Sequence, residues 1–509
     1  MAKIEITSDF RRALGIMAGE RKNLRLTGRA GTGKSTLLRH FRDNTKKDVV
    51  VLAPTGVAAV NIEGQTIHSF FGFKPGIVPE AVRAVKRNGV YQSVETIVID
   101  EISMVRADLL DCVDRFMRLN GRKKKEPFGG AQLVMIGDLY QIPPIVTPEE
   151  RDRFAGKYPS PYFFSSDAFK DLPIEFVELE KVFRQKDDAF VALLNAVRNG
   201  VLTEKILNAF NSRVEPSFEP ASGEFCICLT TTNAGADEVN ARRLAGLKGP
   251  SKRFRGEVSG DFGEKLLPVP EVLDLKKGAQ VMMAKNDPEG RWVNGTVGRV
   301  TGFRGGTVLV ELTGGETAGV EPVQWDNYAF DFNPSTKRVE SESVGSYTQI
   351  PLRLAWAVTI HKAQGKTFER VMVDFGRGTF AGGQAYVALS RCTTLDGLHL
   401  KRPLRKSDIR LDWRIVKFLT GFQWGRAAEK MTVADKTRVI EEAIESKKAL
   451  AIVYLKSSDE KSRREIEPRE VGTMEYLGKP FLGVRAFCRS RREERVFRVD
   501  RILEILPVR

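Results

Sequence analysis

The sequence predicts an α/β protein built on parallel sheets, followed by a small all-β region and a β-rich end. Short apolar strands alternate with helical segments up to about Asn240, and several strands end in glycine or carboxylates, which is typical of parallel α/β folds. From Lys276 to about Val344 the strands are short, alternating and separated by glycine turns, a pattern that indicates an all-β module. At 509 residues the chain has room for three or four domains.

Composition narrows the class of partner. The net charge of +16 and the pI near 9.5 favour a polyanion, nucleic acid before membrane, although general solubility explains the same charge equally well. Five cysteines without a C-x-x-C pair, and only four histidines, argue against a zinc site and for a reducing compartment. The N-terminus lacks a signal-peptide core and no apolar run has the length of a membrane span. We therefore expect a cytoplasmic protein with no membrane partner.

The segment GRAGTGKS, Gly28–Ser35, lies between an apolar-alternating run and a stretch of helical spacing. It fills every position of G-x-x-x-x-G-K-S, whose glycines let backbone N–H groups surround a phosphate. The positive end of the dipole of the following helix also favours a phosphate at this loop. Lys34 can reach the β- and γ-phosphates, and the Ser35 hydroxyl can ligate Mg²⁺. A glycine-rich turn of a Rossmann-like fold is the disfavoured alternative. The predicted nucleotide-binding residues are Gly28, Gly31, Thr32, Gly33, Lys34, Ser35 and Thr36.

Two further apolar strands end in polar side chains. Residues 94–101 (VETIVIDE) end in Asp100, the expected Mg²⁺ partner of Ser35, and Glu101, which would orient or deprotonate the attacking water. Residues 132–144 (QLVMIGDLYQIPP) place Gln141 after the next strand. A neutral amide there can hydrogen-bond the γ-phosphate without adding charge.

Candidate nucleic-acid contacts follow the strand at 49–53. Thr55 is expected at the carboxyl edge of the sheet, where ligands of open α/β sheets bind. In GQTIHSFFGF, residues 64–73, His68 and Ser69 adjoin aromatic residues, a combination that suits phosphates and bases of a single strand. For Phe70 and Phe71 themselves, packing in the core is the favoured interpretation.

Six segments carry a resemblance to a known family. They are IDEISMV (99–105), GDLYQIPP (137–144), VFRQ (182–185), WVNG (292–295), TIHKAQGKT (359–367) and QAYVALSR (384–391). Over about residues 8–425 the chain resembles superfamily 1B helicases of the Pif branch, with RecD-like enzymes as the next relatives. The resemblance implies an ATP-dependent 5′-to-3′ DNA helicase or translocase that uses ATP and Mg²⁺.

The same resemblance implies roles for residues of the second lobe. Arg184, and Arg391 at the end of the alternating segment 384–391, would reach the γ-phosphate when the lobes close, and so couple hydrolysis to movement. His361 and Lys362 would meet the DNA backbone. Gln364, Gly365 and Thr367 would lie between the nucleotide and DNA sites. One position departs from the family pattern, because Phe10 stands where a glutamine usually reads adenine. Strict ATP preference is therefore open.

The implied fold is two RecA-like parallel-sheet motor lobes, an SH3-like β-barrel insertion and a C-terminal small β-rich WYL domain. The expected ranges are 1–170 for the first lobe with a small insertion near 73–86, 171–275 and 345–425 for the second lobe, 276–344 for the barrel, and 426–509 for a linker plus the WYL domain.

The last part of the chain, 426–509, resembles a WYL domain. The resemblance depends on an amphipathic helix, the strand-like segment AIVYLK and the segment FRVDRI (497–502). Glu475-Tyr476-Leu477 stands where the W-Y-L triplet is usually found. WYL domains look like sensors of nucleic acids or nucleotides. Arg469, Arg485 and Arg498 are then candidate phosphate contacts, or else part of a solvated basic face.

The expected partners are single-stranded and forked DNA, with G-quadruplexes and R-loops as further candidates, and the expected state is a monomer. Two alternatives stay open. One is a translocase that displaces proteins from DNA and unwinds poorly. The other is a nucleic-acid-responsive regulator with a weak motor.

Overall fold

The computed structural model describes residues 5–19, 22–74, 76–86, 89–185, 187–220, 224–313, 315–333 and 338–506. They belong to two compact units, Met1–Arg410 and Leu411–Arg509, and each unit is described by itself. No described helix is long and apolar enough to cross a membrane.

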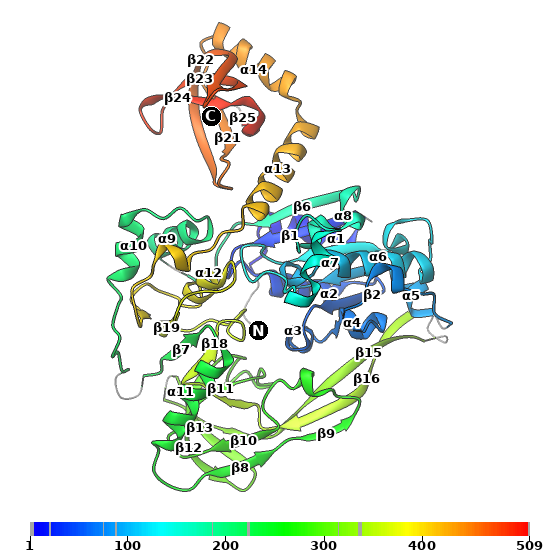
Figure 1. The fold of residues 1–509 in the computed structure, drawn as a ribbon, viewed down its shortest axis with the longest axis vertical. Helices are drawn as coiled ribbons and strands as arrows, with labels where there is room; N and C mark the ends of the chain where they lie inside the picture. The colour runs from blue at the N-terminus through cyan, green and yellow to red at the C-terminus, as the bar shows by residue number, and fades with distance from the viewer. Residues whose placement is uncertain are drawn as a thin grey trace. The chain divides into compact units, whose positions relative to one another are not determined.

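A six-stranded sheet forms the first lobe, in the order β3-β2-β4-β5-β1-β6 with every neighbouring pair parallel (Figure 1). Its strands are β1 (Asn23–Gly28), β2 (Val49–Ala53), β3 (Gln65–Thr66), β4 (Thr96–Ile99), β5 (Gln132–Ile136) and β6 (Ile174–Leu179). The helices of this lobe are α1 (Ser8–Ala18), α2 (Lys34–Asn44), α3 (Gly56–Asn61), α4 (Ile67–Phe71), α5 (Gly89–Ser93), α6 (Ala107–Asn120), α7 (Arg151–Ala155) and α8 (Asp167–Lys170). Because β4, β5 and β1 are neighbours, the loops after their carboxyl ends meet at one edge of the sheet.

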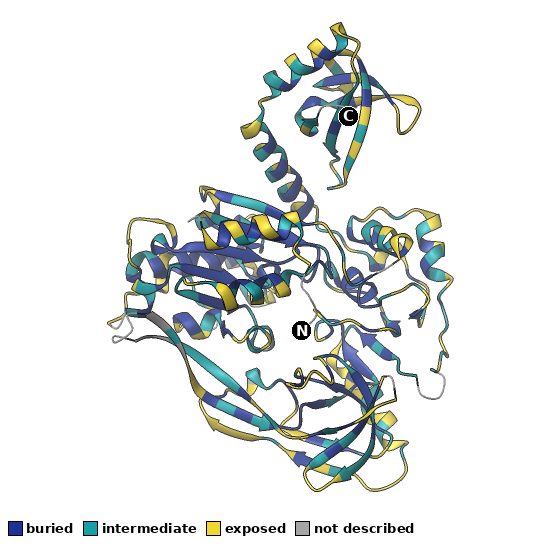
Figure 2. Ribbon diagram, turned by 180° about the vertical axis from the view of Figure 1, so that it is seen from behind, coloured by how far each residue is buried: buried dark blue, intermediate teal, exposed yellow. Residues whose placement is uncertain are grey.

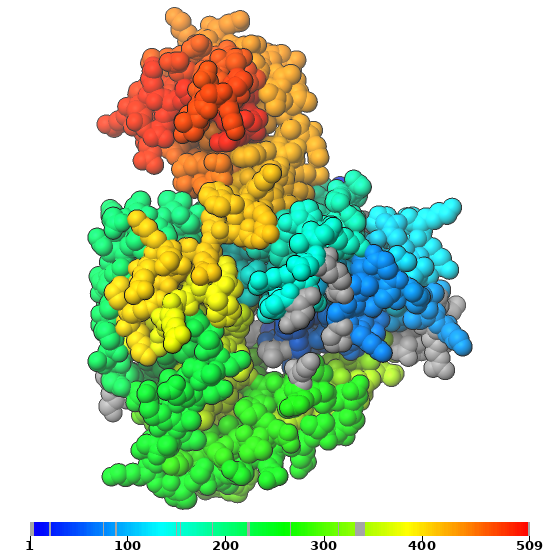
Figure 3. Space-filling model, in the orientation of Figure 1, coloured from blue at the N-terminus to red at the C-terminus, as the bar shows by residue number. Residues whose placement is uncertain are grey.

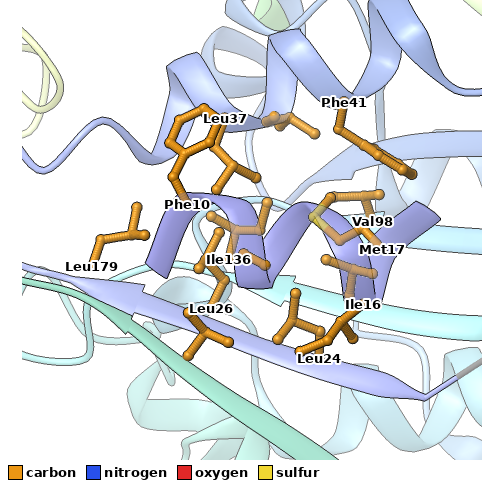
Figure 4. Packing of buried hydrophobic residues seen from close by; sticks show 14 of the residues in the cluster. Phe10, Ile16, Met17, Leu24, Leu26, Leu37, Phe41, Val98, Ile136 and Leu179 are labelled. Carbon is orange, nitrogen blue, oxygen red and sulfur yellow. The ribbon is translucent and has the colours of Figure 1, made fainter. Parts of the chain in front are cut away.

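The core of the first lobe is formed where α1 and α2 cover this sheet. Figure 4 shows Phe10 and Met17 of α1 among Leu37 and Phe41 of α2, all of them buried. The apolar side chains of β1 face the same cluster, and the strands of the sheet are largely dark blue in Figure 2. Phe10, the position at which the sequence departs from the expected glutamine, is therefore a core residue, 4% exposed.

A second parallel sheet, in the order β18-β7-β19-β20, forms the second lobe. Its strands are β7 (Ile227–Thr230), β18 (Ala357–Thr359), β19 (Val371–Asp374) and β20 (Leu398–Leu400), and its helices are α9 (Asp188–Arg198), α10 (Glu204–Asn211), α11 (Asn233–Ala245) and α12 (Gln384–Leu389). The alternating segment 384–391 thus begins as a helix. All six residues of α12 are buried, which explains why its sequence shows no polar helical face.

Between the halves of the second lobe lies an antiparallel insertion, which fills the lower part of this unit in Figure 3. It contains the five-stranded sheet β14-β13-β12-β11-β17, the three-stranded sheet β15-β16-β9 and the pair β10-β8. The strands are β8 (Lys252–Arg255), β9 (Glu257–Gly260), β10 (Val272–Leu275), β11 (Gln280–Met283), β12 (Val297–Arg304), β13 (Thr307–Leu312), β14 (Thr317–Val320), β15 (Val323–Asn333), β16 (Arg338–Gln349) and β17 (Leu352–Leu354). The antiparallel region therefore spans 252–354, wider than the expected 276–344.

Two further expected boundaries differ from the observed elements. The strand β6 pairs with β1, so the first sheet continues past residue 170. The second compact unit begins at Leu411, and helix α13 (Trp413–Lys430) runs without interruption through residue 425, where a linker was expected. The small insertion was expected near residues 73–86. Residue 75 of this stretch lies outside the described residues, and the described part contains a short 3-10 helix, Pro79–Ala81.

The second unit is a five-stranded antiparallel sheet, in the order β24-β23-β22-β21-β25, with α13 and α14 (Val433–Glu445). Its strands are β21 (Leu450–Leu455), β22 (Lys461–Tyr476), β23 (Lys479–Cys488), β24 (Glu493–Arg498) and β25 (Ile502–Leu506). Ile440 of α14 packs on Ile466 and Val484 of the sheet, so one face of the sheet forms a core of its own.

Candidate nucleotide and nucleic-acid sites

The phosphate loop has the predicted backbone geometry. Gly31 and Gly33 have φ angles of 82° and 87°, which favour glycine over residues with a Cβ. Gly33 immediately precedes α2, so Ser35 and Thr36 lie exposed in the first turn of that helix. A phosphate placed there would meet backbone N–H groups and the positive end of the helix dipole.

Lys34 folds back onto the loop. Its Nζ donates to the carbonyl oxygens of Gly28 (2.7 Å) and Arg29 (3.0 Å). Burial lowers the pKa of Lys34, and the charge of Asp138 acts in the opposite direction. The ammonium is therefore held by neutral carbonyls, and a phosphate oxygen offers a charged acceptor in their place.

The carboxylates after β4 lie beside this loop. Glu101 N donates to Asp100 Oδ1 at 2.9 Å, with Glu101 in the left-handed region at φ 49°. Burial raises the pKa of Asp100 and is the main cause that raises the pKa of Glu101 to about 7. The charge of Asp100 raises the pKa of Glu101 further. A carboxyl that titrates near neutrality is suited to accept a proton from water.

Gln364 joins the two lobes at this point. Its Nε2 donates to Glu101 Oε2 at 2.9 Å and to Gln141 Oε1 at 3.2 Å. Gln364 belongs to TIHKAQGKT of the second lobe, whereas its two acceptors follow β4 and β5 of the first. The structure thus brings Glu101 and Gln141 together through an amide from the opposite lobe.

Arg184 lies directly on the phosphate loop. A Cβ on Gly31 would be 2.4 Å from the Cβ of Arg184, and Phe183 N donates to Gly31 O at 2.9 Å. The guanidinium donates to the carbonyl oxygens of Ser390 (3.3 Å) and Gly365 (3.1 Å). Burial lowers the pKa of Arg184 to about 10.

Arg391 is almost fully buried, with 1% of its surface exposed. Its Nε donates to Val387 O (2.8 Å), its Nη1 to Lys366 O (3.3 Å) and its Nη2 to Ser390 Oγ (2.8 Å). Burial lowers its pKa, and the charge of Arg184 lowers it further. The guanidinium groups of Arg184 and Arg391 therefore both donate to uncharged acceptors, and Arg184 contacts the phosphate loop as well.

Three contacts between the lobes were missed by sequence reasoning. Arg198, at the end of α9, approaches Asp138 Oδ1 at 3.3 Å and lies 3.9 Å over the ring of Tyr140. Ala30 N of the phosphate loop donates to the Tyr386 hydroxyl at 3.1 Å. The sequence offered one hint of the Arg198 contacts, which is that this arginine ends a helix whose other residues are largely apolar. An arginine in that position is usually exposed to solvent, so the hint did not predict a contact between the lobes.

The oxygen donors fit Mg²⁺. Ser35 supplies a hydroxyl and Asp100 a carboxylate, which are hard oxygen ligands of the kind Mg²⁺ prefers. Among the described residues, no group of three or more His, Cys, Asp or Glu side chains could hold a metal ion. This donor set matches an ion held by one or two protein oxygens together with substrate phosphates.

The predicted nucleic-acid residues of the first lobe have local partners. Thr55 accepts from Ala58 N as the N-cap of α3, and Ser69 Oγ accepts from Gln65 Nε2 at 3.3 Å. His68 is half-buried, and burial lowers its pKa. Phe70 and Phe71 are 5% and 3% exposed, which confirms that they are core residues.

In the second lobe, His361 and Lys362 follow β18 after one intervening residue. Lys362 is exposed and His361 is half-buried. The His361 ring lies nearly parallel to that of Phe380, at 15° with 6.1 Å between centroids.

The predicted arginines of the second unit are all ion-paired. Arg469 contacts Glu494, Arg485 Nε lies 3.3 Å from Glu470 Oε2, and Arg498 Nη2 lies 2.7 Å from Asp500 Oδ2. These exposed or half-exposed pairs differ from the carbonyl-held arginines beside the phosphate loop.

Two parallel-sheet lobes, the first of which carries a phosphate loop beside its sheet, are the architecture of motor-type P-loop proteins. The chain belongs to a narrower group, the PIF1-like helicase family. The model of that family matches residues 10–206, and the WYL domain model matches residues 435–507.

Curated relatives and solved structures agree with this assignment. Human ATP-dependent DNA helicase PIF1 is 36% identical over 418 residues, covering 79% of this chain and 61% of its own length. The chain thus spans about three-fifths of that relative. ATP-dependent DNA helicase Pif1 of Bdellovibrio bacteriovorus is 33% identical over 411 residues, covering 78% of this chain and 88% of its own. The crystal structure of Bacteroides sp Pif1 with ADP-AlF4 superposes with a TM-score of 0.77 at 33% identity, covering 83% and 98% of the two chains.

Proposed function

We propose that this protein is an ATP-dependent DNA helicase that translocates 5′ to 3′ on single-stranded DNA and opens duplex or forked DNA. The observation that carries the proposal is the Gln364 amide, which bonds Glu101 and Gln141 across the two lobes. Because TIHKAQGKT also contains His361 and Lys362, one short segment reaches both the hydrolytic groups and the candidate DNA contacts. A change at one site can thereby be transmitted to the other.

Each residue of the nucleotide site has a role in this proposal. Lys34 and the glycine loop bind the β- and γ-phosphates of ATP, and Glu101 accepts the proton of the attacking water, with Gln141 oriented beside it. Arg184 and Arg391 stabilise the charge that develops on the transferred phosphoryl group. Mg²⁺, held by Ser35 and Asp100, would neutralise phosphate charge.

Relatives support the choice of substrate. Bacteroides Pif1 has been solved bound to ssDNA, with a TM-score of 0.60 to this chain at 33% identity. A further Pif1 structure describes unwinding at forked dsDNA by two coordinating helicases. We infer that this chain also takes single-stranded and forked DNA, with G-quadruplexes and R-loops as further substrates to examine, and that one chain is sufficient for translocation.

We also infer the division of labour among domains. Residues 5–179 form the first motor lobe, 187–245 with 357–410 the second, and 252–354 the SH3-like insertion. The insertion reaches the first lobe, because Phe330 N donates to Gln65 Oε1 at 3.2 Å. The WYL domain binds nucleic acid and modulates the motor.

Forked-duplex unwinding by the full chain and by a chain that ends at Arg410 tests this proposal. The shorter chain ends at Arg410 because the second compact unit begins at Leu411 and α13 runs through residue 425. We expect DNA-stimulated ATP hydrolysis and strand separation from both, with altered DNA affinity in the shorter chain. Hydrolysis without strand separation, combined with displacement of streptavidin from biotinylated DNA, would instead support the translocase alternative. Absence of DNA-stimulated hydrolysis would support the regulator alternative.

A further inference from the structure

Four consecutive cations, Arg122 to Lys125, lie on the exposed loop that follows α6. Lys123 is paired with Glu126, at 2.8 Å between Nζ and Oε1. The structure shows no ion pair for Arg122, Lys124 or Lys125 with any residue that it describes. At these three positions positive charge is exposed and uncompensated, in contrast to the ion-paired arginines of the second unit.

The backbone of this loop is held by α6. Asp114, which is 8% exposed, accepts from Phe128 N at 2.7 Å and from Arg118 Nε at 2.6 Å. Arg118 Nη1 donates in turn to Lys125 O at 3.0 Å. The loop is thus tied to the helix at both of these positions, and a fixed backbone lowers the entropic cost of binding a partner on it.

A second exposed segment, 83–86 (RAVK), lies beside the start of the loop. Asn120, the last residue of α6 and 1% exposed, accepts from Val85 N at 2.8 Å and donates to Arg83 O at 3.5 Å. Arg83 and Lys86 are both exposed. Two segments that are distant in the sequence therefore place their cations together. We call this the α6-end surface, and its cations are Arg83, Lys86, Arg122, Lys124 and Lys125.

The α6-end surface offers charge without aromatic rings. Segments 83–86 and 121–126 contain no aromatic residue, and Phe128, the first one after the loop, is fully buried. Sites for single strands combine cations with rings on which bases stack. In a duplex the bases are stacked inside, and the phosphates carry one charge per about 1.7 Å of axis. The surface therefore fits the backbone of a duplex better than a single strand.

The α6-end surface lies close to the candidate single-strand residues of the first lobe. Helix α4 contains His68 and Ser69, and its Phe71 packs against Phe116 of α6 with 5.2 Å between ring centroids. Figure 1 shows both helices at the same end of the lobe. Phe116 precedes Asn120 by four residues, which is about 6 Å along a helix. A fork whose single strand meets α4 thus brings its duplex arm within reach of the surface.

We propose that the α6-end surface binds the phosphate backbone of the duplex arm of a DNA fork. The proposal rests on the proposed function and adds a duplex-binding surface to it. Because the contacts are to phosphates, they carry no sequence information. The surface holds the duplex beside the first lobe while one strand is drawn from it.

The full-length variant R122A/K124A/K125A tests this surface. Fluorescence anisotropy at several salt concentrations compares a labelled oligothymidylate with a fork that has the same single-stranded arm. The unmodified protein should bind the fork about tenfold more tightly than the oligothymidylate. The variant should lose that gain and keep its single-strand affinity within about twofold. Its slope of log affinity against log salt on the fork should be less steep by about 2.7, since each phosphate contact contributes about 0.9.

Two variants serve as matched controls. K124R/K125R keeps the charge and should keep the fork affinity. K205A/K248A/K277A removes the same charge from exposed positions elsewhere in the first unit and should leave the fork affinity and the slope unchanged.

Three results would overturn the duplex-binding surface and leave the proposed function intact. They are an unchanged fork affinity in R122A/K124A/K125A, an equal loss on both DNAs, and an equal loss in the K205A/K248A/K277A control. Absence of DNA-stimulated ATP hydrolysis by the unmodified protein would overturn the proposed function instead, whatever the salt slopes.

Discussion

The arginines of the motor and those of the C-terminal unit differ in what holds them. Arg184 lies against the phosphate loop, and both Arg184 and Arg391 donate to carbonyl or hydroxyl oxygens. Arg469, Arg485 and Arg498 lie near the surface, and each contacts a carboxylate. The first pair keeps its positive charge unneutralised in a buried environment, whereas charge in the second set is already compensated.

This difference shows why arginine content alone is a poor guide to anion binding. Neutral acceptors orient a guanidinium without cancelling its charge, so an incoming phosphate gains the full electrostatic interaction in a region of low dielectric. An exposed ion pair must be broken or shared before a phosphate can benefit, and solvent screens what remains. We therefore expect substitutions in the motor to have large effects and those in the second unit small ones.

The largest effect is expected for Lys34→Ala. It removes the ammonium that we propose contacts the β- and γ-phosphates, so DNA-stimulated ATP hydrolysis should be abolished while DNA binding is largely retained. Phosphate release and anisotropy with single-stranded DNA measure the two properties. Unwinding of a forked duplex by this variant at the unmodified rate would refute the proposed mechanism.

Next in size is Arg391→Ala. Arginines that stabilise the transferred phosphoryl group contribute about 10³-fold or more to kcat, and we expect a loss of about that size. Arg391→Lys should be nearly as inactive, because a lysine cannot reproduce the three separate donors. Thermal unfolding of both variants is the control, since the buried acceptors of Arg391 lose their partner. A kcat within tenfold of the unmodified enzyme would show that Arg391 is structural.

A change of pH should have an intermediate effect on the rate of ATP hydrolysis. The pKa of Glu101 is raised to about 7, and a proton acceptor acts only when deprotonated. Hydrolysis without DNA should therefore fall as pH decreases through about 7 and level off above it. Because the folded state binds this proton more tightly than the unfolded chain, the same group makes folding less favourable as pH rises from about 4.5 to 7. A kcat/KM profile that is flat between pH 6 and pH 8 would exclude Glu101 as the base.

The smallest effects belong to the second unit. Arg469→Ala, Arg485→Ala and Arg498→Ala should each change single-strand affinity by about threefold or less, because their charges are paired. Glu494→Gln provides the converse test, since it frees Arg469. It should strengthen binding at low salt and make the salt dependence steeper. A tenfold loss of single-strand affinity in any one of the arginine variants would show that its ion pair breaks when the protein binds DNA.

Local patterns predicted much of the fold and of the nucleotide site. The strands at 49–53 and 132–136, and the glycine loop before α2, follow from apolar runs and turn residues that act over a few positions. Domain limits were less predictable. Strand β6 joins the first sheet by pairing with β1, about 150 residues earlier in the chain, and helix α13 passes through the expected linker because its charged residues also suit a solvated helix.

The sequence by itself identified the phosphate loop, the carboxylates Asp100 and Glu101 at the end of a strand, and the motifs that contain Arg184 and Arg391, because each is encoded in a few consecutive residues. Tertiary structure alone decided which partners these groups meet. It placed Gln364 between Glu101 and Gln141, put Arg198 over Tyr140, buried Phe10 and exposed Phe380. Those outcomes depend on close packing between segments that are far apart in the chain, and a short sequence motif does not specify which distant segment will pack against it.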